Sequence, residues 1–252
     1  MFTQTTLVNL MVLVTLALQV AILVGMYKRD LRREFRVFFT YTSFTLCLAL
    51  VELFFLNSSG YKSKEYFLVY WLGFSVHITL MFFVIQEVYG NVLHRYEGLR
   101  TLSNMIFRWA FMLLVLLAIA AVLSSPPADR DWVYSPILKM DHGARIVEFG
   151  LIVLLFAFAR TLALNLRGCA FGIAVGTCFY CSTELAVTAL RNHYGNAAVV
   201  LDTFATPLFS IIALGIWTTY MYRAEREPFN IGRAVHPQLE EWNRAVLQFL
   251  NR

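Results

Sequence analysis

Seven long runs of apolar residues alternate with short polar segments along the chain. Each run is about twenty residues long, which is the length that an α-helix needs to cross the hydrocarbon core of a bilayer. A helix suits this environment because all of its backbone N–H and C=O groups are paired within the segment. The pattern therefore predicts an all-α integral membrane protein with a seven-helix transmembrane domain at residues 1–222. The seven runs lie near residues 5–27, 37–56, 66–89, 104–123, 143–164, 169–190 and 200–222.

Only one of the polar segments between the runs is long. It covers residues 124–141 and reads SSPPADRDWVYSPILKMD. Proline lacks a backbone N–H and interrupts helices, so Pro126, Pro127 and Pro136 predict an ordered outer loop or a short interfacial hairpin at this point.

The last thirty residues, 223–252, form a predicted cytoplasmic tail. Within it, Leu239, Trp242 and Val246 share one helical face, while charged and amide side chains share the other. This pattern predicts a C-terminal amphipathic helix that lies on the inner membrane surface. The alternative is a docking helix for a cytoplasmic or membrane protein partner.

Composition supports a membrane protein, and the charge distribution predicts its orientation. Hydrophobic residues make up 59% of the 252 residues and the mean hydropathy is +0.62, which excludes a water-soluble fold. Of the 21 Lys and Arg residues, 15 fall on the side of the first, third and fifth connections and the tail. By the positive-inside rule this side is cytoplasmic, which places the N-terminus outside. We expect the protein to lie in the bacterial cytoplasmic (inner) membrane. Despite its net charge of +5, we expect no nucleic acid partner.

Ionisable residues inside the predicted spans are the best indication of a site. Each costs about 2.5–3.5 kcal/mol at membrane depth on insertion scales, so a retained one has a partner or a task. Tyr70 lies seven residues before His77, on the same helical face, and Arg145 lies three residues before Glu148, within pairing distance. Alternating helix directions place five groups in the outer half of the bundle. They are Glu52, His77, Glu148, Glu184 and Asp202.

Two interpretations of these residues stay open. In the first, Glu52, Tyr70, His77, Arg145, Glu148, Glu184 and Asp202 line an outward-facing acidic pocket that binds a cationic or hydrogen-bond-donating ligand, or a proton. In the second, they form hydrogen bonds and ion pairs that hold the helices together. A metal site is not predicted, because Glu-x-x-His pairs are absent and only His77 is deep in the membrane.

Two other sequence features concern cofactors and contacts between helices. The last span has no lysine, which excludes retinal bound as a Schiff base, and no other cofactor is predicted. Gly168, Gly172 and Gly176 form a ridge of small residues that allows close helix approach. Packing within the bundle is the first use we expect for it, and homodimerisation is the alternative.

No enzyme motif stands out in the sequence. The function that it favours is a receptor-like membrane sensor or ligand-binding module that signals through a separate partner. The alternatives are a structural or accessory subunit of a membrane protein complex and, as a minor one, an intramembrane metal hydrolase.

Overall fold

The computed structural model describes residues 2–59, 64–93, 97–123, 134–161, 168–194 and 196–223. Within these ranges the chain forms seven α-helices and one short 3-10 helix, with no strand, which confirms the predicted all-α class. Each predicted apolar run falls on one of the seven helices. In order, the elements are α1 (Phe2–Lys28), η1 (Leu31–Arg33), α2 (Arg36–Ser59), α3 (Lys64–Val92), α4 (Glu97–Leu123), α5 (Tyr134–Thr161), α6 (Cys169–Tyr194) and α7 (Asn196–Arg223).

Helix α5 begins earlier than the sequence pattern predicts. Residues 134–141, expected in a loop, belong to its first two turns. Pro136 is tolerated there because the first backbone N–H groups of a helix have no intrahelical acceptor. The rest of the predicted loop, 124–133, and the predicted amphipathic helix in the tail lie outside the described residues.

Six helices are long and apolar enough to cross a membrane, with mean hydropathies between 1.3 and 2.3. Over the described residues α5 is not among them, and it carries Arg145 and Glu148 near its middle. The fold is therefore that of an integral membrane protein in which six of the described helices are suited to span the bilayer, and a bundle of seven spans stays a prediction. The six stretches are Asn9–Lys28, Arg36–Phe55, Val69–Val92, Gly98–Leu116, Cys169–Leu190 and Phe204–Arg223.

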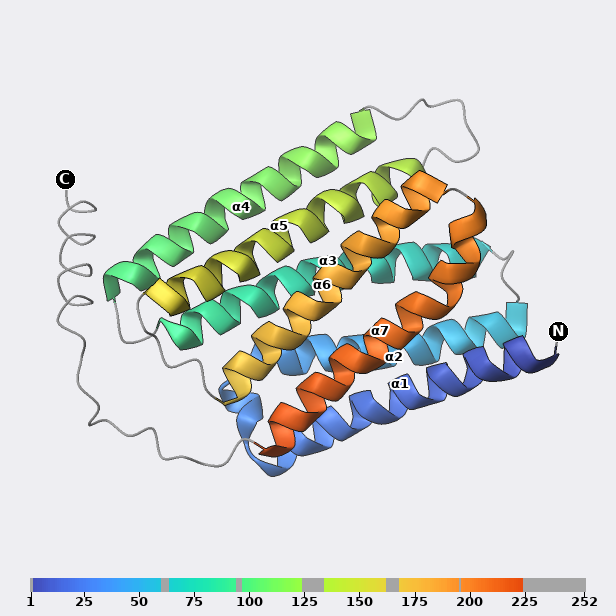
Figure 1. Cartoon of the computed structure of the whole chain (residues 1–252), viewed down its shortest axis with the longest axis horizontal. Helices are drawn as coiled ribbons and strands as arrows, with labels where there is room; N and C mark the ends of the chain where they lie inside the picture. The colour runs from blue at the N-terminus through green and yellow to red at the C-terminus, as the bar shows by residue number, and fades with distance from the viewer. Residues whose placement is uncertain are drawn as a thin grey trace.

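The helices form a closed ring in chain order. Each helix packs against the next one, and α1 contacts α7 to close the ring. Helix α3 also contacts α5 and α6, so it occupies the inside of the bundle. Figure 1 shows neighbouring helices running in alternating directions, with the N-terminus and the end of α7 at opposite ends of the bundle.

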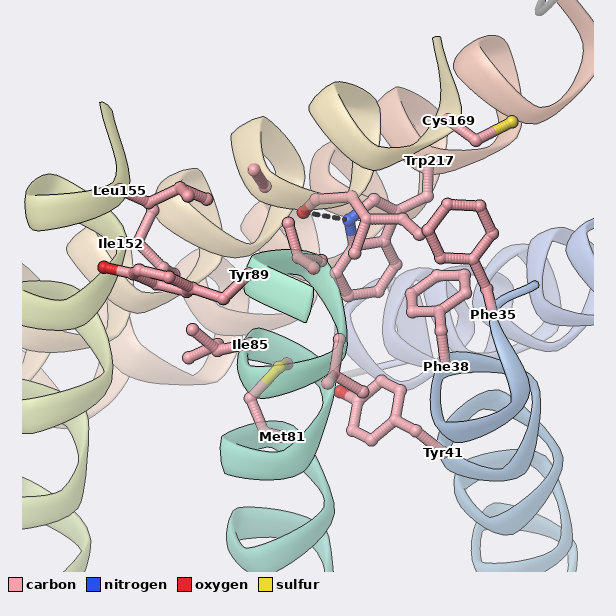
Figure 2. Close-up of a cluster of buried hydrophobic side chains, with 14 of the residues drawn as sticks. Phe35, Phe38, Tyr41, Met81, Ile85, Tyr89, Ile152, Leu155, Cys169 and Trp217 are labelled. Carbon is pink, nitrogen blue, oxygen red and sulfur yellow. Dashed lines mark hydrogen bonds between the residues drawn. The ribbon is translucent and has the colours of Figure 1, made fainter. Parts of the chain in front are cut away.

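Aromatic side chains hold α2 and α7 together near the end of the bundle where α1 connects to α2. The ring of Trp217 packs edge-to-face against Phe38, with centroids 5.2 Å apart, and against Tyr41, at 6.2 Å. The Trp217 Nε1–H donates a hydrogen bond to the carbonyl of Ile173 in α6, at 3.2 Å (Figure 2). Three helices are thereby fixed relative to one another around one indole ring.

Two glycines of the predicted ridge bring α6 against α7. A Cβ atom at Gly172 would lie 2.2 Å from the Cβ of Tyr220, and one at Gly176 would lie 2.2 Å from the Nε1 of Trp217. No side chain larger than hydrogen fits at either position. Gly168 has another role, since it precedes α6 with a φ of +87°, a conformation that glycine adopts without strain.

The start of α2 is held by a carboxylate from α3. Glu87 accepts hydrogen bonds from the backbone N–H groups of Val37, at 2.8 Å, and Phe38, at 2.9 Å. These donors belong to the first turn, where a helix has no acceptors of its own. The contact sets the position of α2 along α3, and with it the residues that follow.

Candidate functional site

A cavity of about 190 Å³ lies inside the bundle, between α1, α2, α3, α6 and α7. We name it the central cavity. Helix α2 contributes the longest part of its wall, from Tyr41 to Glu52, which at 1.5 Å per residue is about 16 Å. The cavity is therefore elongated along the helices. The described residues that line it are Thr15, Gln19, Tyr41, Thr42, Thr45, Leu48, Ala49, Glu52, His77, Tyr180, Ser210, Ala213, Leu214 and Trp217.

Three threonine hydroxyls of this wall donate hydrogen bonds to backbone carbonyls of their own helices. The hydroxyl of Thr15 donates to the carbonyl of Met11 at 2.9 Å, and that of Thr42 to the carbonyl of Phe38 at 2.9 Å. Thr45 donates in the same way to the carbonyl of Thr42, at 3.0 Å. These side chains keep their oxygen lone pairs, so toward the cavity they act as acceptors.

Two buried polar atoms of the wall have no hydrogen-bond partner among the described residues. They are Oε1 of Gln19 and Nε2 of His77. Gln19 is a deeply buried residue, only 8% exposed, in the middle of α1. A buried polar atom without a partner costs about 1–3 kcal/mol, so such atoms normally meet water or a ligand. Both atoms belong to residues that line the same cavity.

The imidazole of His77 is held between two tyrosines. Its ring centroid lies 5.2 Å from that of Tyr41 and 6.3 Å from that of Tyr180. These contacts come from α2 on one side and α6 on the other. They fix the imidazole ring in place, so His77 is a preorganised part of the wall.

A second polar centre lies beside the cavity and is closed. Arg145 and Glu148 form the ion pair that their spacing predicts, at 3.4 Å, with side chains that are 3% and 0% exposed. The thiol of Cys181 in α6 donates to the same carboxylate oxygen, at 3.6 Å. The guanidinium of Arg145 lies over the ring of Tyr180, 5.0 Å from its centroid. Tyr180 thus contacts the ion pair and also lines the central cavity.

The structure divides the predicted site residues into groups. Glu52 and His77 line the central cavity, whereas Arg145 and Glu148 form the buried pair. Tyr70 is 38% exposed and packs on Trp71 and Phe74 of its own helix.

Two other predicted residues lie away from the cavity wall or beyond what is described. Glu184 is half-buried in α6 and is not part of the described cavity wall. Asp202 lies in α7, and its side chain is outside the described part of the chain. The seven predicted residues therefore do not converge on one pocket.

Several residues of the cavity wall were not predicted from the sequence. Gln19 had a signal, because it is an amide in the middle of an apolar run whose mean hydropathy is 2.3, and such a residue is expensive at membrane depth. Tyr41, Tyr180 and Trp217 had none, because aromatic residues are frequent along the whole chain. Only the packing of the helices separates these three from the others.

The arrangement is suited to holding a small molecule. It combines a partly open volume, aromatic walls and a few polar atoms, which is the usual composition of a ligand site. Among the described residues, no group of three or more His, Cys, Asp and Glu side chains is placed to hold a metal ion. Comparison of the chain with models of protein families, with curated proteins and with solved structures finds no match.

Proposed function

We propose that this protein is a receptor-like membrane sensor or ligand-binding module whose central cavity takes up a small cationic or hydrogen-bond-donating molecule. One observation carries the proposal: the Oε1 of Gln19 and the Nε2 of His77, two residues of the cavity wall, are buried without a partner in the described part of the chain. Both residues line the cavity, and a small change of side-chain conformation would bring the two atoms to a molecule bound there. The residues that carry these unpartnered polar atoms and the space for a ligand are therefore at the same place in the bundle.

The size of the cavity restricts the ligand to a small molecule. An apolar cavity of about 150 Å³ is known to bind benzene. The central cavity, at about 190 Å³, is slightly larger. It therefore suits a single ring with a short polar substituent, or a compact aliphatic molecule of the same volume.

We further propose seven spans, with α5 as the seventh, an N-terminus outside and a C-terminus in the cytoplasm of a bacterial inner membrane. The excess of Lys and Arg on one side of the bundle supports this orientation. Glu52 lies seven residues before the end of α2, about 10 Å from it. In this orientation that end is the outer one, so the acidic end of the cavity is nearer to the outside.

Tyr180 supports a sensing role because it contacts both the central cavity and the buried Arg145–Glu148 pair. It lines the cavity, and the guanidinium of Arg145 in α5 packs over its ring. A molecule that moved the ring would therefore change the surroundings of the ion pair. The signal would pass to a separate partner at the cytoplasmic face, where we propose that the tail helix acts.

A structural or accessory subunit is the second candidate. The buried Arg145–Glu148 pair of α5 supports it, because Cys181 and Tyr180 of α6 contact this pair, and polar contacts between helices hold a bundle together. The glycine ridge does not add to this support, because Gly172 and Gly176 already meet α7 of the same chain. Homodimerisation through this ridge has no free surface at these two positions.

Filling the cavity tests the proposed function. Ala213 is 1% exposed and lines the cavity, so Ala213→Leu places a larger side chain in the space of the ligand. We expect benzyl alcohol and benzylamine to raise the melting temperature of the wild-type protein in lipid nanodiscs, and we expect Ala213→Leu to abolish this rise. Differential scanning fluorimetry measures both.

Ala144→Leu is the matched control for that experiment. Ala144 is also 1% exposed, but it lies in α5 and is not part of the described cavity wall. Overpacking at this position should lower stability by about 1–3 kcal/mol while the response to the two molecules is kept. An equal response in wild type and Ala213→Leu would show that the molecules act on the lipid or elsewhere on the protein, and would refute the proposal.

A further inference from the structure

We infer that the ligand of the central cavity is a small organic cation that carries N–H donors, a primary or secondary ammonium attached to an apolar body. The inference rests on the proposed function, that the cavity binds a ligand at all. It narrows the ligand from any donor-bearing molecule to one chemical class. Three features of the cavity wall point to this class independently.

The first feature is formal charge. Glu52 is the one acidic residue of the described wall, and neither Lys nor Arg lines the cavity. The carboxylate lies at one end of the elongated space, within helix α2. In a low-dielectric interior such a charge attracts a cation much more strongly than it does in water. An anionic ligand would meet repulsion and find no opposing charge.

The second feature is the balance of donors and acceptors. The hydroxyls of Thr15, Thr42 and Thr45 and the indole N–H of Trp217 all donate to backbone carbonyls. The Oε1 of Gln19, in contrast, is an acceptor without a partner. The lone pairs of the three threonine hydroxyls and the oxygen of Gln19 suit a ligand that donates several hydrogen bonds. An ammonium group offers up to three.

The third feature is the aromatic end of the cavity. Tyr41 and Trp217 lie in contact there, and Tyr180 lies across from Tyr41 on the other side of His77. These rings offer apolar contact to the body of the ligand, while its ammonium group lies toward Glu52. Figure 2 shows Tyr41 and Trp217 projecting toward each other from α2 and α7.

The guanidinium of Arg145, which lies beside the cavity, does not oppose this charge. Arg145 lies 5.0 Å from the centroid of Tyr180, so it is beside the cavity and not in its wall. Its charge is balanced by Glu148, at 3.4 Å. The pair is neutral as a unit, which leaves Glu52 as the charge that the ligand meets.

Three molecules of the same size and different charge test the inference. They are benzylamine, a cation at neutral pH, benzyl alcohol, which is neutral, and benzoate, an anion. We expect the full chain in nanodiscs to bind benzylamine most tightly and benzoate least, by calorimetric titration with Ala213→Leu as the control for partitioning into lipid. Glu52→Gln should weaken benzylamine about tenfold, or about 1.4 kcal/mol, and leave benzyl alcohol unchanged.

Gln19→Met provides a second variant that separates binding from folding. Methionine has a similar length and removes an acceptor that has no partner among the described residues, so the melting temperature should stay the same or rise. The affinity for benzylamine should nevertheless fall. A residue with only a structural role would not give this combination.

The outcomes distinguish the inference from the proposed function. If benzyl alcohol binds as tightly as benzylamine, or if Glu52→Gln keeps the preference for the amine, the cavity is a ligand site but the ligand is not a cation. If none of the three molecules binds more tightly to wild type than to Ala213→Leu, both the proposed function and the inference fail.

Discussion

Arg145 and Glu148 place two opposite charges in the interior of the bundle with almost no exposed surface. The desolvation of such a pair is expensive, and the attraction between the charges does little more than offset it. The pair is therefore a weak source of net stability, yet the loss of one partner leaves the other charge buried. Cys181 and Tyr180, both from α6, complete its surroundings.

We predict that single and double substitutions of this pair differ sharply. Arg145→Met should lower the free energy of unfolding by about 3–5 kcal/mol, because it leaves the Glu148 carboxylate without its guanidinium. Arg145→Met combined with Glu148→Met should recover most of this loss. Unfolding of the purified protein in mixed micelles by increasing sodium dodecyl sulfate measures both. Losses that simply add in the double variant would contradict a coupled pair.

Helices α6 and α7 make the most extensive contact between any two elements of the described chain. Gly172 and Gly176 allow it, since a Cβ at either would overlap Tyr220 or Trp217. The same contact holds Trp217 in place, with its N–H on the carbonyl of Ile173. Because Trp217 lines the cavity, the shape of the site depends on this helix pair.

We predict opposite effects for two glycine-to-alanine changes in these helices. Gly172→Ala should lower stability by about 1–3 kcal/mol, because the new methyl group meets the Cβ of Tyr220 close to its backbone. Gly215→Ala in α7 is the matched control, with nothing within 4 Å of the new atom, and it should raise stability by up to about 1 kcal/mol. Thermal unfolding in detergent measures both. Equal effects would mean that α6 and α7 are not packed as described.

At the scale of the whole molecule, the central question is how many helices cross the membrane. Six described stretches are apolar enough, and α5 carries its charges where other helices cover them. A helix that packs against α3, α4 and α6 need not be apolar on every face. An odd number of spans places the two ends of the chain on opposite sides of the membrane, and an even number places them on the same side.

We predict opposite sides. An epitope tag at the N-terminus should be removed by protease added to intact bacterial spheroplasts, whereas a tag at the C-terminus should be cleaved only after lysis. Immunoblots of both tags, with a cytoplasmic protein as the marker for intact cells, give the answer. Two tags with the same sensitivity would refute the seven-span topology and leave α5 as a helix that does not cross.

Part of the candidate site could be predicted from the sequence. Glu52 and His77 stand out as ionisable residues within apolar runs, and both line the cavity. The Arg145–Glu148 pair follows from a spacing of three on one helix, which brings side chains together wherever the helix packs. The expectation of one shared pocket did not hold for Glu148, because which helix faces meet depends on the rotation of each helix in the bundle.

The amino-acid sequence is sufficient to predict that the chain is helical, where six of the apolar stretches lie, and that costly polar residues lie within them. These properties depend on the length and hydropathy of local segments, which each segment carries alone. That Gln19 of α1 and His77 of α3 share a cavity wall with Trp217 of α7 follows from the packing of the helices and cannot be read from the sequence. The same is true of the position of Tyr180, between this cavity and the buried Arg145–Glu148 pair. Such contacts between helices depend on how the helix surfaces pack together, and this packing involves residues from the whole chain.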